Sequence, residues 1–282
     1  MTQHQQIKET PPTELGPARA LAHGAAQLLT KAARANLEAS PDDSHSNLGW
    51  DGETQRFVSQ PLHGANGEVY VGLSLSPFEL TLIDVATGTS SYQLTGHTFA
   101  EAAAWLDDAL ESVALKRAAD VSLPYDLPSD VAAIARVPDA LPEGLASLAG
   151  WFDLAGGALE RLAADQAELT PGPSPVRCWP HHFDIATYVS LETGDAETAK
   201  GIGVGMSPGD ESYAQPYFYV NPWPHLDASA LPDAPAPGHW HTQGFVGAIA
   251  TGDEVLSTAK TAKALSDYLE NAFSIGHTLL MK

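Results

Sequence analysis

The segment WPHHFD, residues 179–184, places a carboxylate two residues after a histidine. Side chains alternate between the two faces of a strand, so His182 and Asp184 are predicted to share one face. The opposite face then carries Phe183 and Ile185. A carboxylate beside an imidazole raises its basicity and fixes its tautomer, as a general base requires. A structural His–Asp pair explains the same residues, so the pair is a catalytic candidate only.

A second group is HWH, whose histidines His239 and His241 lie two residues apart. On a strand they share a face and can bind one metal ion, which further ligands must complete. The possible further ligands are His182, Asp184, His225, Asp210 and Glu211. The set of His182, Asp184, His239 and His241 predicts a site for a divalent transition metal such as zinc. The chain has one cysteine, which excludes a cysteine-based metal cluster. Solvated loop histidines explain the HxH spacing equally well.

The aromatic run PYFYVNPWP, residues 216–224, predicts either a ligand groove or part of the core. If the last strands pair, Tyr217, Tyr219 and Trp223 line one groove together with Trp240. Such a groove suits a small organic molecule. Core packing accounts for the same side chains.

The segment GIGVG, residues 201–205, looks at first like a dinucleotide-binding loop. That fingerprint needs a helix directly after the glycines, whereas a Ser-Pro-Gly-Asp turn follows here. Alternating glycines in a strand leave room for a ligand or for an aromatic ring. We expect a Trp or Tyr ring to pack over them.

The elements that must position these residues occur twice in the chain. GLSLSPFE at 72–79 and GVGMSPGD at 203–210 share the order of glycine, alternating apolar residues, Ser-Pro and an acidic residue. A helix-capping box follows each passage, TFAE at 98–101 and TGDE at 251–254. Internal self-similarity of this kind predicts two copies of one α+β unit.

The predicted fold class is therefore α+β, with two pseudo-repeats that each consist of an antiparallel β-sheet (meander) and flanking helices. We expect a disordered tail over 1–16, the first repeat over 17–117, a Pro-rich connector over 118–142, and the second repeat, with the candidate site, over 143–282. Helices are expected over 17–37, 99–115, 145–165 and 252–273, and strands over 50–62, 69–76, 80–85, 90–94, 176–191, 200–207, 216–221 and 239–248. Whether the two sheets merge stays open.

The 282-residue chain has a formal net charge of -21 and no basic stripe. Such a surface repels phosphate backbones and anionic lipid, so nucleic acid and membrane are not expected as partners. No window is apolar and long enough to span a bilayer, and the N-terminus lacks the features of a secretory signal. The expected location is the cytoplasm, and a homo-oligomer is compatible with the composition.

The order of elements, the WPHHFD strand, the SPGDE turn at 207–211 and the PYFYV strand at 216–220 resemble a widespread bacterial family of uncharacterised proteins, a domain of unknown function. The resemblance extends over nearly the whole chain after the tail. It implies a fold but no activity and no catalytic residue.

Three functions are compatible with these patterns. The first is binding of a small molecule in an aromatic and His-lined groove of the second repeat. The second is a metal-dependent enzyme of hydrolase type that uses His182, Asp184, His239 and His241. The third is a non-catalytic scaffold or oligomerisation protein. We rank binding first because no complete catalytic set is visible.

Overall fold

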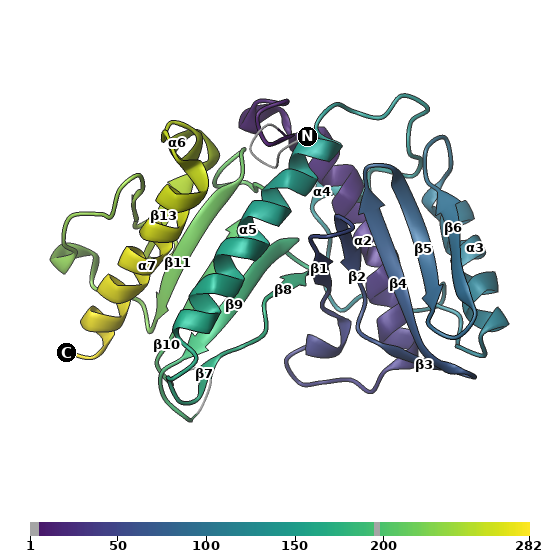
Figure 1. Cartoon of the computed structure of the whole chain (residues 1–282), viewed down its shortest axis with the longest axis horizontal. Coiled ribbons are helices and arrows are strands. Elements are labelled where there is room, and N and C mark those ends of the chain that lie inside the picture. The colour runs from purple at the N-terminus through teal and green to yellow at the C-terminus, as the bar shows by residue number, and fades with distance from the viewer. Residues whose placement is uncertain (1–5, 195–197) are drawn as a thin grey trace.

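The computed structural model describes residues 6–194 and 198–282 and is an α+β protein with two sheet-based halves (Figure 1). The first half contains α2 (Gly16–Asn36), β1 (Gly49–Asp51), β2 (Arg56–Val58), β3 (Leu62–Gly64), β4 (Gly67–Leu75), β5 (Phe78–Asp84), β6 (Gly88–Gln93) and α3 (Phe99–Ser112). The connector contains α4 (Ser129–Ala132). The second half contains α5 (Leu145–Asp165), β7 (Gly172–Pro173), β8 (Arg177–Trp179), β9 (Asp184–Ser190), β10 (Gly201–Ser207), β11 (Tyr217–Trp223), β12 (His239–His241), β13 (Gly247–Thr251), α6 (Gly252–Leu256) and α7 (Thr261–Leu280).

Both sheets are antiparallel. The strand order is β1-β2-β4-β5-β6 in the first sheet, with β3 beside β4, and β12-β13-β11-β10-β9-β7 in the second, with β8 beside β9. In Figure 1, α2 and α3 lie behind the first sheet, whereas α5 and α7 lie in front of the second. Each sheet therefore has one face covered by its own helices, and the two covered faces point in opposite directions.

The two sheets meet edge to edge through one antiparallel bridge. The amide of Leu48 donates to the carbonyl of Cys178 (2.9 Å), and the amide of Cys178 donates to the carbonyl of Leu48 (2.8 Å). Aromatic rings from both halves pack beside this bridge: the ring centroids of Phe57 and Phe152 are 4.7 Å apart, and each lies 5.3 Å from Phe183. The halves are thus continuous through a buried core as well as through the backbone.

Local signals position the helices as expected. The capping boxes are both present, with Thr98 accepting from the amide of Glu101 and Thr251 from that of Glu254. These side chains satisfy amides that would otherwise lack partners at the helix start. The helices predicted at 17–37, 99–115 and 145–165 are confirmed to within about three residues at each end.

Several sequence-based boundaries are wrong, because turns interrupt segments that continue the apolar alternation. The strand predicted over 50–62 consists of β1, β2 and the first residue of β3, and that over 176–191 is the hairpin β8–β9. The strand over 239–248 is divided between β12 and β13, and the helix over 252–273 between α6 and α7.

The disordered tail expected over 1–16 is also a wrong prediction for residues 6–16, while residues 1–5 lie outside the described part. Ile7 is buried in the core, and the amide of the Gln6 side chain donates to the carbonyl of Ala146 (2.7 Å). An apolar side chain and a specific hydrogen bond therefore attach this segment to the start of α5.

Candidate functional site

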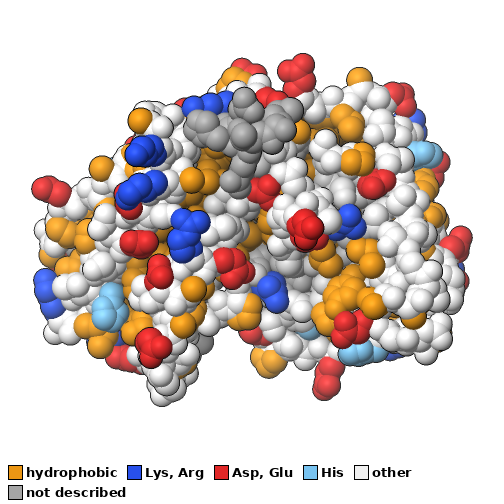
Figure 2. All heavy atoms as spheres, viewed as in Figure 1, with side chains coloured by type: hydrophobic (Ala, Val, Ile, Leu, Met, Phe, Trp, Pro, Cys, Tyr) orange, Lys and Arg blue, Asp and Glu red, His pale blue; other side chains and the backbone are white. Residues whose placement is uncertain are grey.

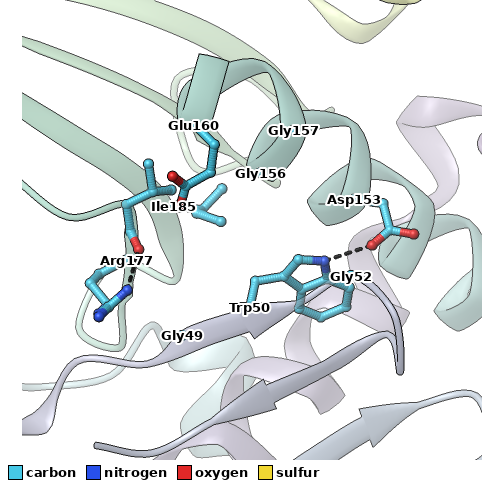
Figure 3. A pocket seen from close by; sticks show the side chains of 10 residues that line it. Gly49, Trp50, Gly52, Asp153, Gly156, Gly157, Glu160, Arg177 and Ile185 are labelled. Carbon is cyan, nitrogen blue, oxygen red and sulfur yellow. Dashed lines mark hydrogen bonds between the residues drawn. The ribbon is translucent and has the colours of Figure 1, made fainter. Parts of the chain in front are cut away.

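A cavity of about 520 Å³ lies where the two halves meet, between α5 and the adjoining strands β1 and β8. Figure 2 shows this side of the molecule, with acidic and basic side chains interspersed and the outline notched between the halves. Figure 3 shows Asp153, Gly156, Gly157 and Glu160 along the helix, with Trp50 and Arg177 opposite. Apolar side chains from the second half, including that of Ile185, complete the lining.

The indole of Trp50 is held in one orientation within this cavity. Its Nε1–H donates to Oδ1 of Asp153 (2.7 Å), and the amide of Gln55 donates to the other carboxylate oxygen. The ring of Phe57 packs edge-on against the indole at a centroid distance of 4.8 Å. Burial raises the pKa of Asp153 from its ordinary value, an effect that the two hydrogen bonds oppose. The cavity therefore has a rigid aromatic wall with a carboxylate at one end.

Gly156 and Gly157 leave the surface of α5 without side chains beside the indole of Trp50. A Cβ at Gly156 would lie 3.4 Å from Cδ1 of Trp50, whereas no atom lies within 4 Å of a Cβ built at Gly157. Glycine inside a helix costs about 1 kcal/mol relative to alanine. The two glycines therefore weaken α5 and leave the cavity wall bare, although a Cβ at Gly156 would only make an ordinary contact with the Trp50 ring.

Opposite charges line the other end of the cavity. The guanidinium of Arg177 donates to the carbonyl of Val176 (2.9 Å), and within residues 6–194 and 198–282 no carboxylate forms an ion pair with it. Glu160 is exposed on the helix across from it. Arg177 thus keeps donors that a bound molecule can use.

The predicted pair of His182 and Asp184 is not formed as one strand face, because residues 180–183 make the turn between β8 and β9. The amides of His182 (3.2 Å) and Phe183 (2.7 Å) both donate to the carbonyl of Trp179, and Phe183 adopts a φ of 61° in this turn. His182 is exposed, and Asp184 instead accepts a hydrogen bond from the hydroxyl of Tyr219. Burial raises the pKa of Asp184.

The predicted ligand-binding aromatic residues do not line one groove. Tyr217, Tyr219 and Trp223 share the face of the second sheet that the helices leave uncovered, whereas Trp240 pairs with Ala248 and faces the helices. Tyr217 is buried and donates to Asp210 (2.6 Å). The indole of Trp240 donates to the carbonyl of Pro232 (2.8 Å), and Trp223 packs edge-on against His225 at 4.9 Å.

The glycine run of β10 lies under tyrosine rings, as the sequence predicts. A Cβ at Gly201 would overlap the ring of Tyr188, and a Cβ at Gly205 would overlap the hydroxyl end of Tyr219. Because Gly205 has no side chain, the Tyr219 ring can cross this face of the strand toward Asp184.

His239 and His241 share one face of β12, as expected, and both contact the hydroxyl of Tyr213. The hydroxyl oxygen lies 3.1 Å from Nε2 of His239 and 2.9 Å from Nδ1 of His241. Their other ring nitrogens contact Oε1 of Glu254 (3.1 Å) and the backbone carbonyl of Gln243 (2.5 Å). Burial, with the nearby Glu254 carboxylate, raises the pKa of Tyr213.

The turn before β11 brings Tyr213 to these histidines. Oδ1 of Asp210 accepts from the amides of Ser212 (2.8 Å) and Tyr213 (3.1 Å), which fixes the turn locally. Edge strand β12 pairs with β13 and presents the two imidazoles from the other side. The SPGDES signal predicts the turn but not which residue it places against β12.

The four predicted metal ligands are not brought together. Asp184 belongs to β9 and His239 to β12, and the strands β10, β11 and β13 lie between them. At about 4.8 Å per strand this is about 19 Å, too far for ligands with bonds of about 2 Å. In the part of the chain that the structure describes, no group of three or more His, Cys, Asp and Glu side chains could hold a metal ion.

Comparisons with models of protein families, with curated proteins and with solved structures found no match to this chain. The resemblance to a bacterial family of uncharacterised proteins therefore stays a prediction. Among the described residues, no helix combines the length and apolar character that crossing a bilayer requires.

Proposed function

We propose that this protein binds a small polar organic molecule in the cavity between its halves. The observation that carries the proposal is the cavity itself, whose volume of about 520 Å³ lies in the range typical of small-molecule sites, about 300–1,000 Å³. It combines a fixed indole with a few convergent polar groups, which is the usual composition of such sites. The proposal keeps small-molecule binding, as the sequence suggests, but moves it away from the aromatic strand.

The charges of the lining favour a zwitterion. Asp153 and Glu160 are seven residues apart on α5, so they face the same side at a separation of about 10 Å along the helix axis. Two carboxylates repel a dianion and attract a cationic group, while Arg177 offers donors to a carboxylate. A free amino acid or a short peptide, with an ammonium and a carboxylate, matches this arrangement.

Binding can be tested by isothermal titration with free amino acids and dipeptides, beside dicarboxylates and neutral saccharides as competing classes. Arg177→Gln removes the cation from the cavity. Because a charge-assisted hydrogen bond contributes about 1.5–3 kcal/mol, we expect this variant to weaken zwitterion binding about 10- to 100-fold.

Arg161→Gln is the matched control for the loss of one arginine. Arg161 lies one residue after Glu160 but donates to Ser266 of α7 (3.1 Å), outside the cavity lining. Zwitterion affinity that is equal in the two variants would contradict the proposal, as would the absence of any zwitterion binding to the unaltered protein.

A further inference from the structure

When both imidazoles are neutral, the cluster of Tyr213, His239 and His241 has more lone pairs than protons to join them. A carboxylate and a backbone carbonyl only accept, so His239 must use its Nδ1–H for Glu254 and His241 its Nε2–H for Gln243. In neutral rings the remaining nitrogens are then both acceptors. Both contact the same hydroxyl, which has one proton and can donate to one of them. Neutral imidazoles therefore leave one of the four contacts unsatisfied.

A metal cation at this point satisfies both imidazole lone pairs at once. Ligating histidines characteristically donate their second N–H to a carboxylate or a backbone carbonyl, which orients the ring and fixes its tautomer. His239 has the carboxylate of Glu254 as this partner, and His241 has the carbonyl of Gln243. Each histidine therefore already has the hydrogen-bond acceptor that the second ring N–H of a metal-bound histidine needs.

The distances fit a shared ion. With bonds of about 2.05 Å, the ligands of a tetrahedral ion such as Zn²⁺ lie about 3.3 Å from each other, and neighbouring ligands of a square-planar ion such as Cu²⁺ lie about 2.9 Å from each other. The hydroxyl oxygen of Tyr213 lies 3.1 Å and 2.9 Å from the two imidazole nitrogens that face it. Small movements of the three side chains are enough to admit an ion between them.

We propose that Tyr213, His239 and His241 form a binding site for a borderline first-row transition-metal cation such as Zn²⁺ or Cu²⁺. Two imidazoles favour these ions over Mg²⁺ and Ca²⁺, which prefer oxygen ligands only. The phenol loses its proton to solvent when its oxygen binds the ion. Three protein ligands leave at least one coordination position for water or a substrate. The site lies on the edge strand β12 and is independent of the cavity between the halves.

The test uses the full-length chain after dialysis against a chelator, titrated with Zn²⁺ by calorimetry and with Cu²⁺ by visible spectroscopy. We expect one equivalent of either ion to bind. Tyr213→Phe keeps the ring and its packing, so it should fold. It is expected to abolish the visible charge-transfer band of a Cu²⁺–phenolate and to weaken Zn²⁺ binding.

Glu254→Gln removes the carboxylate that contacts Nδ1 of His239. The loss of such a partner of a ligating histidine typically lowers metal affinity about 10- to 100-fold. Thr251→Ala controls for damage to the capping box, since Glu254 also caps α6. Its zinc affinity should stay within about threefold of the unaltered protein's. His182→Ala controls for adventitious binding at the adjacent rings of His181 and His182, whose centroids are 4.3 Å apart.

The proposal is overturned by any of four results. The first three are the absence of stoichiometric binding, equal loss of affinity in Thr251→Ala and Glu254→Gln, and retention of the Cu²⁺ charge-transfer band in Tyr213→Phe. Loss of binding in His182→Ala together with unchanged binding in His239→Ala would also overturn it, because the ion would then belong to the exposed pair.

Discussion

Acidification should destabilise this protein through His23, a buried histidine of α2 at the junction of the halves. Its Nε2–H donates to the carbonyl of Pro180 (2.8 Å), and its ring stacks on Phe183 with a centroid distance of 5.0 Å and an interplanar angle of 6°. The side chain is 3% exposed, and burial lowers its pKa from 6.5 to about 4. The ring is therefore neutral in the folded protein at neutral pH.

The direction of the effect follows from proton binding. Because the pKa is lower in the folded state than in the unfolded state, the unfolded chain takes up a proton first as the pH falls. The contribution of the neutral His23 ring to the free energy of unfolding is fully present above pH 6.5. It decreases as the pH falls from 6.5 to 4 and does not change further below pH 4. A difference of about 2.5 pKa units corresponds to about 3 kcal/mol in total, of which about 2 kcal/mol is lost between pH 7 and pH 5.

The measurement is urea unfolding at pH 7 and pH 5 for the unaltered protein and His23→Gln. Glutamine keeps a donor for Pro180 but does not titrate, so the difference in unfolding free energy between the two proteins isolates the histidine. Gln27→Ala is the matched control, because Gln27 donates to the same carbonyl (2.9 Å) and does not titrate either. The reasoning would be refuted if the unfolding free energies of the unaltered protein and His23→Gln differed by the same amount at pH 7 and pH 5.

Two further predictions concern local structure. Thr98→Ala and Thr251→Ala each remove a helix cap and should lower the unfolding free energy by about 1 kcal/mol in chemical denaturation. Gly205→Ala should destabilise by about 1–3 kcal/mol because its Cβ would overlap the Tyr219 hydroxyl, whereas Gly157→Ala, with open space around its Cβ, should stabilise α5 by up to about 1 kcal/mol. Equal effects of the two glycine substitutions in thermal unfolding would show that the space around them does not matter.

The helices could be predicted because their signals are local. The apolar stripes of α2, α3 and α5 and the capping boxes at Thr98 and Thr251 depend on residues within a few positions of one another. The matching order of a long helix, a meander and a capped helix in both halves follows from the same signals.

The broken strands could not be predicted from alternation alone. Phe183 and Ile185 are both buried, so the apolar period of two continues through a residue that belongs to a turn. This is why His182 and Asp184 are predicted as neighbours on one strand face, although His182 belongs to the turn and Asp184 begins β9. The two-residue alternation correctly places His239 and His241 on one face, because the three residues of β12 contain no turn.

Both candidate sites depend on contacts between segments that are distant in sequence. Trp50 and Asp153 are 103 residues apart, and Tyr213 lies 28 residues before His241. Patterns in the sequence mark single members of each site, such as the two glycines of α5 or the HWH segment, but not their partners. Gly156 and Gly157 line the cavity where the two halves of the chain meet, but the residues opposite them, Trp50 and Arg177, come from other segments and carry no signal that links them to α5.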